Sequence, residues 1–465
     1  MAEIPDKVLR LAREVDALHG RALLVGGCVR DPLMDRTPKD WDVEVYGVEP
    51  ARLRSLLEQF GRVDAVGEAY TVYKLGNDLD VSLPRRERKS GHGHRAFVIE
   101  GDPGMSIEEA TRRRDFTINA ILQNPLTSEI IDPFDGRVDI EKKILRAVSP
   151  LTFGEDSLRV LRAAQFAARF EFIIEPATYD LCRSIGVTDL PGERIWGEVE
   201  KLLLQARRPS IGLKFLYDVG ATSQLFPELQ ALVGVKQEED WHPEGPVDVH
   251  TLLVVDRARE LIDDLPYPRQ LAVMLGALCH DLGKPATTEF VDGKIRSRGH
   301  DEAGIAPTES FLDRLKIHTL DGYDVRAQVI GLVRDHLKPG EFYKKRDEVS
   351  DGAFRRLARR CELDLLYRVA KADSLGRNTD SMPQDKRYGS DAQEWFIERA
   401  RELEVELHAP APLLMGRHLL EMGLEPGKRV GEITRAVYEM QLDGRVSTVD
   451  EAIEWARRLI LDGGS

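Results

Sequence analysis

Apolar residues in roughly the first 145 positions fall into short runs bounded by Gly, Pro or Asp. Such runs predict β-strands, and a helical pattern lies between them at residues 50–61. We therefore expect a mixed sheet with helices on one side, the packing of an α/β domain. The expected strands cover residues 22–27, 40–47, 71–76, 79–84, 95–101 and 116–124.

The pattern changes near residue 150, after which strand signals almost vanish. Apolar residues then recur at helical spacing, which predicts successive helical bundles. These helical segments are residues 155–170, 193–206, 269–283, 301–317 and 448–461. Segments rich in Pro, Gly and acidic residues at 236–248 and 378–391 predict seams between the bundles. The predicted regions are an α/β head (1–147), an all-α neck (148–240), a second helical domain (241–378) and a helical tail (379–465).

Composition narrows the class of protein. A chain of 465 residues is too long for one core, and its 42% hydrophobic and 31% charged residues are ordinary for a soluble protein. We expect no membrane association, because no apolar run approaches a membrane span and the charged start of the chain is unlike a signal peptide. The cysteines lack disulfide or metal-ligand spacing, which favours a reducing cytoplasm. They are Cys28, Cys182, Cys279 and Cys361.

The formal net charge of −14 argues against a protein that coats nucleic acid non-specifically. Local basic clusters at residues 84–95 and 111–115 still allow a local nucleic-acid site. Either cluster alone is better explained as solvated loop charge.

Two aspartates stand on one predicted strand. Side chains alternate along a strand, so Asp40 and Asp42 point to one side while Trp41 points to the other. Two adjacent carboxylates repel each other unless a cation lies between them, and Mg²⁺ suits because it binds few carboxylates and keeps room for phosphate oxygens. A two-metal site can activate a hydroxyl and stabilise a pyrophosphate leaving group.

A glycine turn precedes this strand. Gly26 and Gly27 would let backbone amides approach triphosphate oxygens, and Arg30 would add positive charge. Asp80, on a later strand, could complete the acidic site. The D-x-D pattern alone is more typical of two exposed strand carboxylates, and the preceding glycines shift the interpretation toward a site.

Five motifs in order resemble the class II tRNA nucleotidyltransferase and bacterial poly(A) polymerase family. They are "GGCVRD" followed by "KDWDVEVYG", then "RRDFTINA", "DPFDGRVDIEKKILRAV", "EDSLRVLRAAQFAARF" and "ERIWGEVEKLL". The resemblance implies a nucleotidyltransferase head with a polymerase beta-like mixed sheet. It also implies that Asp40 and Asp42 are the metal-binding catalytic pair and that Asp80 is an acidic residue on the neighbouring strand.

The same resemblance implies nucleotide contacts. Arg114, Asp115 and Asn119 match the motif that holds the ribose and phosphates. Asp156 and Arg159 would face the base of CTP or ATP as a protein template, with Glu155 orienting the arginine and Arg162 also binding nucleotide. Such paired contacts discriminate between bases by roughly 1–3 kcal/mol. The simpler alternative is a surface ion pair between Glu155 and Arg159, one helical turn apart.

A loop at residues 85–97 lies where the family has a flexible segment that helps to switch from CTP to ATP. Its presence favours complete CCA addition over CC addition.

A second constellation resembles the HD phosphohydrolase superfamily. The resemblance implies metal ligands at His250, His280, Asp281 and Asp373, with His300 and His336 as candidates for a second metal or for phosphate contacts. Imidazoles with carboxylates suit a divalent transition metal (Mn, Ni, Co, Fe or Zn), which could activate water against a phosphoester. Any one of these histidines alone could be an ordinary core histidine. Family members with this domain act on 2′,3′-cyclic phosphates and 2′-nucleotides.

The expected function is therefore CCA addition to tRNA 3′ ends from CTP and ATP with Mg²⁺, with a second phosphohydrolase site. The helical tail resembles the family's C-terminal segment, which implies contact with tRNA. Within the family, poly(A) polymerase, CC-adding and A-adding enzymes are the alternatives. Outside it stand an HD phosphohydrolase with a nucleotide-sensing head and a non-catalytic RNA-binding scaffold. The sequence leaves the oligomeric state open.

Overall fold

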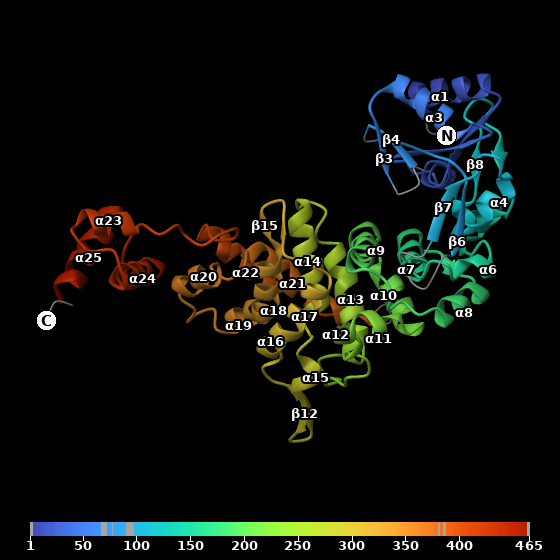
Figure 1. Ribbon diagram of the computed structural model, residues 1–465. Coiled ribbons are helices and arrows are strands. Elements are labelled where there is room, and N and C mark those ends of the chain that lie inside the picture. Colours follow the sequence, from blue (N-terminus) through green and yellow to red (C-terminus); the bar gives the residue numbers. More distant parts are fainter. Residues whose placement is uncertain are drawn as a thin grey trace. The chain divides into compact units, whose positions relative to one another are not determined.

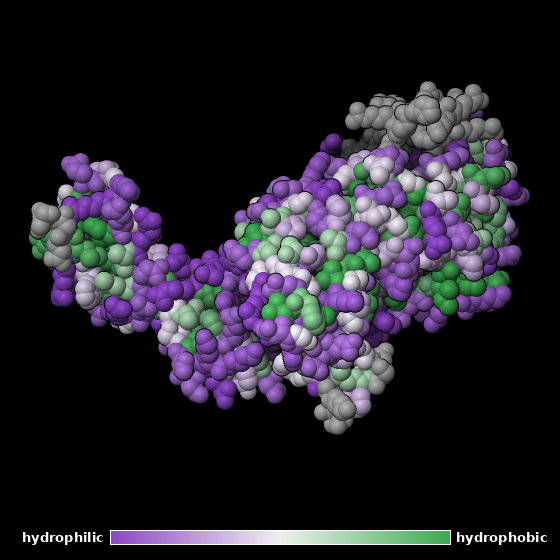
Figure 2. Space-filling model, turned by 90° about the horizontal axis from the view of Figure 1, so that it is seen from below, coloured by the Kyte–Doolittle hydropathy of each residue, from purple (hydrophilic) through white to green (hydrophobic). Residues whose placement is uncertain are grey.

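The computed structural model describes residues 3–66, 72–76, 78–89, 97–379, 382–384 and 387–462. The chain divides into two units, Met1–Leu225 and Phe226–Ser465. Figure 1 shows the sheet of the first unit and the helices of the second. In the view of Figure 2, hydrophilic residues cover most of the surface, and apolar residues form separate patches between them.

The apolar runs of the first unit form a mixed sheet of seven strands in the order β3-β4-β5-β2-β1-β8-β9. Strands β2 and β5 are parallel, with Asp42 opposite Asp80, and the other neighbours are antiparallel. The mixed sheet confirms the fold class predicted for the head. The strands are β1 (Arg21–Val25), β2 (Trp41–Tyr46), β3 (Val63–Val66), β4 (Val72–Leu75), β5 (Leu79–Ser82), β8 (Leu122–Gln123) and β9 (Ile130–Ile131).

Apolar side chains lie on both faces of this sheet. Helices α1 (Asp6–Ala17) and α3 (Pro50–Leu57) cover one face, where they pack with Leu24 and Val43. Leu23 of β1 packs in another cluster, which includes residues of α4 (Ile107–Arg112). The expectation of helices on one side only was therefore wrong. Successive residues of β1 are apolar and point to opposite faces of the sheet, so both faces need a covering layer.

The run at 116–124 is only partly a strand. Residues Thr117–Asn119 form a 3₁₀ turn, and the strand is limited to β8. The carboxylate of Asp115 accepts hydrogen bonds from the Phe116 amide and the Asn119 side chain. Such local side-chain bonds compete with the hydrogen-bond ladder of a sheet.

Residues 85–89 and 97–101 pair as a separate hairpin of β6 (Arg85–Lys89) and β7 (Phe97–Gly101). Residues 90–96 of the predicted loop lie outside the described residues, and so do parts of the seam at 378–391.

The neck is helical, as predicted. Helix α7 is buried over most of its length, and α10 approaches it so closely that a Cβ at Gly212 would lie 2.5 Å from the Ala164 carbonyl oxygen. Glu155 and Asp156 precede α7, so Glu155 and Arg159 do not lie one turn apart within that helix. The helices are α6 (Pro150–Phe153), α7 (Leu158–Phe170), α8 (Pro176–Ser184), α9 (Gly192–Gln205), α10 (Pro209–Asp218) and α11 (Ala221–Leu225).

The second unit consists mainly of helices, with two short hairpins that its sequence pattern did not predict. The hairpins are β12–β13 (Thr288–Val291, Lys294–Ser297) and β14–β15 (Thr319–Leu320, Tyr323–Asp324). The helices are α12 (Pro227–Gln230), α13 (Val247–Arg259), α14 (Tyr267–Cys279), α15 (Lys284–Thr287), α16 (His300–Ala303), α17 (Ile305–Arg314), α18 (Val325–Asp335), α19 (Lys338–Lys344), α20 (Asp351–Leu357), α21 (Leu363–Gly376) and α22 (Asp391–Glu402).

The tail carries a hydrophobic cluster of its own. Its helices are α23 (Gly416–Glu421), α24 (Lys428–Leu442) and α25 (Val449–Asp462). None of the helices among the described residues is long and apolar enough to cross a membrane. All four cysteines lie in described parts of the chain, where they are buried and unpaired.

Candidate functional site

Strand β2 presents the acidic residues of the head. Asp40 directly precedes the strand and is exposed, whereas Asp42 is partly buried. Both line a cavity of about 270 Å³, while Val43 and Trp41 contact the core on the other side. The expected alternation of side chains is therefore observed.

The surroundings of Asp42 disfavour its negative charge, as expected where a cation binds. Burial raises its pKa, the charges of Asp80 and then Asp40 raise it further, and Arg114 opposes them. Three carboxylates thus meet, and Arg114 and Lys74 oppose their charge in part. A divalent cation coordinated by carboxylate oxygens would relieve this repulsion, so the residues fit Mg²⁺.

The glycine turn lies directly beside these acids. Gly26 has a φ of 70°, and a Cβ there would lie 3.6 Å from Asp42 Oδ2 and 3.7 Å from Arg114 Nη1. Glycine adopts this left-handed conformation without steric cost. Gly27 begins the short helix α2 (Gly27–Arg30) and lines the same cavity.

Arg30 is buried and held by protein partners. Its Nε lies 2.8 Å from Asp31 Oδ1, its Nη1 donates to Asn119 Oδ1 at 2.5 Å, and its guanidinium stacks on the rings of Phe166 and Phe170 in α7. These contacts join the glycine turn to the neck. The predicted contact of Arg30 with phosphate stays a prediction.

Asp115 is the centre of a buried network. Its Oδ1 accepts from the Phe116 amide at 2.8 Å and from Asn119 Nδ2 at 2.9 Å, and its Oδ2 accepts from Arg162 Nε at 2.7 Å. Burial alone would raise the Asp115 pKa, but Arg162 and Asn119 lower it below the ordinary value. Arg162 also lies 3.8 Å from Glu198 of α9, so the network connects the head with two neck helices.

The predicted template residues line a second cavity of about 340 Å³. Asp156 Oδ2 accepts from Arg194 Nη2 at 2.8 Å. The guanidinium of Arg159 donates to the Thr152 and Arg113 carbonyls at 2.7 and 2.5 Å. Residues that line this cavity include Arg113, Arg114, Asp115, Asp156, Arg159 and Arg162.

Glu155 contacts a residue other than the one expected. Its Oε2 accepts from Arg113 Nη2 at 3.2 Å, and the Arg113 carbonyl accepts a hydrogen bond from Arg159 Nη2. Glu155 and Arg159 therefore both contact Arg113, Glu155 at its side chain and Arg159 at its backbone carbonyl.

Sequence reasoning missed Glu44. It lies on the same face of β2 as Asp42, accepts from the Tyr46 hydroxyl at 2.5 Å and lies 3.6 Å from Arg114 Nη2. It therefore holds Arg114 beside the acidic cluster. The signal was the continued alternation of acidic residues in "DWDVE".

The second unit brings together all six predicted HD residues. Three histidines follow one rule, in which Nδ1 is bonded to the carbonyl three residues earlier. His280 bonds to Ala277, His300 to Ser297 and His336 to Val333, at 2.8, 2.7 and 2.6 Å. An imidazole that donates from Nδ1 keeps a lone pair on Nε2, as a metal ligand requires.

The Nε2 atoms converge on Asp281. Those of His280 and His300 lie 3.2 and 3.4 Å from its carboxylate oxygens. The Nε2 atoms of His300 and His336 are 3.2 Å apart. With both Nδ1 atoms protonated, these two lone pairs would repel each other without a shared cation. His280 Nε2 is buried and makes no hydrogen bond to any described residue.

His250 and Asp373 complete the centre. His250 Nε2 lies 3.0 Å from Asp373 Oδ1 and 4.0 Å from Asp281 Oδ2. Burial would raise the pKa of Asp281, but the charges of His280 and Lys284 hold it well below its usual range. Burial and the neighbouring His300 lower the pKa of His336 to about 4, which keeps this imidazole neutral. Buried imidazoles around a carboxylate fit a divalent transition metal.

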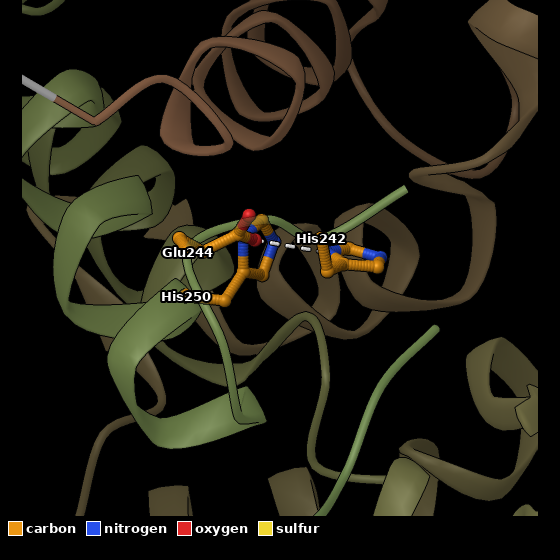
Figure 3. Close-up of side chains that lie close together, drawn as sticks. All are labelled: His242, Glu244 and His250. Atoms are coloured by element: carbon orange, nitrogen blue, oxygen red, sulfur yellow. Dashed lines mark hydrogen bonds and ion pairs between the residues drawn. The ribbon is translucent and has the colours of Figure 1, made fainter. Parts of the chain in front are cut away.

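Two residues of this centre were missed. His242 and Glu244 belong to the segment predicted as a seam, yet they lie beside His250 (Figure 3). The Nδ1 atoms of His242 and His250 lie 2.8 and 2.7 Å from Glu244 Oε1. Burial raises the pKa of Glu244, but these two histidines lower it to about 2. The available signal was a histidine and a glutamate closely preceding His250 in "WHPEGPVDVH".

Models of known protein families match the two regions of the chain that contain these sites. The chain matches models of the poly A polymerase head domain over residues 22–146, of the probable RNA and SrmB-binding site of polymerase A over residues 171–232, and of the HD domain over residues 247–378.

Curated relatives extend over nearly the whole chain. It is 35% identical over 425 residues to the multifunctional CCA protein of Xanthomonas campestris pv. campestris, covering 88% of this chain and 95% of the relative. The multifunctional CCA protein of Stenotrophomonas maltophilia (strain R551-3) is 38% identical over 373 residues, covering 76% and 86%.

Solved structures share the fold at low identity. The Bacillus stearothermophilus CCA-adding enzyme in complex with CTP has a TM-score of 0.65 and 20% identity, covering 99% of this chain and 100% of that one. The Thermotoga maritima CCA-adding enzyme with tRNA has a TM-score of 0.59 and 20% identity, covering 98% and 96%.

Proposed function

Since the chain belongs to the family of multifunctional CCA proteins, we propose that it completes tRNA 3′ ends by adding CCA from CTP and ATP, with release of pyrophosphate. One observation carries this proposal. Arg162 lines both the cavity of the acidic residues and the cavity of the template residues. A nucleotide could therefore place its phosphates near one set of side chains and its base near the other.

Asp40, Asp42 and Asp80 would hold Mg²⁺ in the head. When bound there, Mg²⁺ lowers the pKa of the RNA 3′-hydroxyl and stabilises the pyrophosphate leaving group. Gly26 and Gly27 leave room for phosphate oxygens, and Arg114 supplies positive charge beside them.

Base selection would follow from donors and acceptors. The Asp156 carboxylate accepts from the exocyclic amine of cytosine or adenine, and Arg159 donates to a ring or carbonyl acceptor. Uracil and guanine present the opposite pattern at the amine position and would be rejected.

The second unit supports a second activity, a phosphohydrolase that acts on 2′,3′-cyclic phosphates and 2′-phosphates of RNA ends. His250, His280, Asp281 and Asp373 would hold a transition metal (Mn, Ni, Co, Fe or Zn), and His300 and His336 would hold a second one. Such a metal supplies a nucleophilic water. Beside the centre, Lys284 and His300 line a cavity of about 190 Å³, where a phosphoester could bind.

The division into head (1–147), neck (148–240), HD domain (241–378) and tail (379–465) is part of this proposal, as are tRNA contact by the tail and a cytoplasmic location. Domain models matched at 22–146, 171–232 and 247–378 support the boundaries.

Three tRNA transcripts test the main activity. They end before CCA, after C and after CC, and each is incubated with Mg²⁺ and CTP, ATP or both, with products resolved to one nucleotide. Growth of all three to CCA followed by arrest is the expected result. Arrest at CC identifies a CC-adding enzyme, action on the CC end alone an A-adding enzyme, and long A tails a poly(A) polymerase. No incorporation would leave a phosphohydrolase with a nucleotide-sensing head.

A further inference from the structure

We propose that Glu244 is a positioning residue of the HD centre, whose carboxylate fixes the ring of His250 so that Nε2 faces the metal. This inference rests on the proposed metal function of that site. It assigns a role to the segment between neck and HD domain, which the sequence pattern predicts only as a seam.

His250 is the exception among the four histidines that the sequence predicted for the centre. The other three donate from Nδ1 to a backbone carbonyl three residues earlier. The equivalent carbonyl for His250 belongs to Val247, and it accepts from Thr251 Oγ1 at 2.9 Å. His250 Nδ1 lies instead 2.7 Å from Glu244 Oε1, a short contact that is bent relative to a straight hydrogen bond.

The local sequence places Glu244 there. Gly245 adopts a φ of 110°, which favours glycine, and its amide donates to the His242 carbonyl at 3.1 Å. Pro246 then begins α13 as its N-cap. This turn folds Glu244 back onto His250, the fourth residue of the new helix.

Glu244 is itself held in place. His242 Nδ1 contacts the same oxygen, Oε1, at 2.8 Å, and the side chains of Glu244 and His250 are fully buried. Figure 3 shows the carboxylate against the His250 ring, with a dashed line to His242. A buried carboxylate with an imidazole on either side has little freedom to turn.

The consequence concerns the opposite side of the ring. A carboxylate at Nδ1–H fixes the tautomer that leaves Nε2 free, and it strengthens Nε2 as a ligand. That Nε2 lies 3.0 Å from Asp373 Oδ1, at the centre. A cation bound between Glu244, His242 and His250 is the competing arrangement. Nitrogen and oxygen ligands that lie about 2.1 Å from one metal ion stand about 3 Å or more apart, so separations of 2.7 and 2.8 Å favour the positioning role.

The test measures Co²⁺ binding to the full chain by absorption titration. Glu244→Gln keeps the shape of the side chain and loses its charge, and Glu244→Ala removes the acceptor. Glu239→Gln is the matched control, since Glu239 is an exposed carboxylate of the same segment. We expect the Glu244 variants to bind Co²⁺ about 10- to 100-fold more weakly, with Ala weaker than Gln, and the control to bind like wild type.

A second measurement separates positioning from general stability. In the Co²⁺-loaded protein, each ligating histidine with a protonated Nδ1 gives a hyperfine-shifted, exchangeable proton signal. Glu244→Ala should lose one such signal and keep those of histidines bonded to backbone carbonyls. Circular dichroism in chelator at the working temperature should match wild type, so that loss of the signal is not loss of the fold.

The outcomes are distinguishable. If Asp281→Asn binds Co²⁺ as tightly as wild type, the proposed metal centre fails, and the role of Glu244 fails with it. If Asp281→Asn loses Co²⁺ but Glu244→Gln and Glu244→Ala bind normally, only the role of Glu244 is overturned. If Glu244→Gln loses one full equivalent of Co²⁺ at unchanged affinity for the rest, Glu244 is a ligand, and the positioning role is wrong.

Discussion

Replacing Asp115 by Asn should loosen the junction between head and neck. The two carboxylate oxygens of Asp115 have different partners. Oδ1 accepts from the Phe116 amide and the Asn119 side chain, and Oδ2 accepts from the Arg162 guanidinium. If the Asn oxygen takes the place of Oδ1, its NH₂ group faces the guanidinium, donor against donor. The variant loses the ion pair and leaves Arg162 with an unfavourable neighbour.

The magnitude follows from burial. Breaking a buried ion pair by removing one partner costs about 3–5 kcal/mol. The Arg162 side chain is 31% exposed, so water compensates in part, and we expect about 2–3 kcal/mol in the free energy of unfolding of the first unit. At 1.4 kcal/mol per factor of ten, this corresponds to about 30- to 150-fold faster hydrogen exchange of the most protected amides.

Hydrogen exchange followed by mass spectrometry is the assay, because peptides from α7 report on the first unit separately from the second. Asp180→Asn on α8 is the control, since Asp180 is exposed. Exposed substitutions usually change stability by no more than about 0.5 kcal/mol.

The pH dependence has a defined sign. The pKa of Asp115 is lowered in the folded state, so its contribution is present above the ordinary carboxyl pKa of about 4 and is lost as pH falls through the folded value. The difference between wild type and Asp115→Asn should therefore be constant between pH 5 and 8. Exchange of α7 within threefold of wild type, or a difference that halves within this window, would refute the reasoning.

Three further predictions concern the two sites. Asp42→Asn should lower CCA addition by at least about 100-fold, because metal stabilisation of the transition state is worth several kcal/mol, whereas Co²⁺ binding in the second unit should not change. Asp156→Asn should lower the preference for CTP over UTP by about 5- to 150-fold, the equivalent of 1–3 kcal/mol, measured by single-nucleotide incorporation; equal preference in wild type and variant would remove Asp156 from the template. His280→Ala should abolish hydrolysis of an RNA 2′,3′-cyclic phosphate while CCA addition continues, and loss of both activities together would contradict two independent sites.

Short-range patterns were sufficient for much of this protein. The alternation along β2 predicted that Asp40 and Asp42 share a side, because strand geometry depends only on neighbouring residues. Helical periodicity predicted α7 and α9 of the neck and α14 and α17 of the second unit for the same reason. The sequence motifs also named all six HD residues, although His250 and Asp373 are 123 residues apart. That result came from resemblance to a known superfamily, since spacing alone does not say which residues meet.

Only the tertiary structure decided which partners these residues take. It joins Arg30 to Asn119 across 89 residues and Asp115 to Arg162 across 47, and it pairs Glu155 with Arg113. It also turns a predicted seam back so that Glu244 reaches His250. Sequence by itself determined the local periodicity and the kinds of side chain available, because these depend on neighbours along the chain. The partners of buried charges depend on how separate elements pack, since burial makes each charge require a partner at hydrogen-bonding distance, and packing determines which one is there.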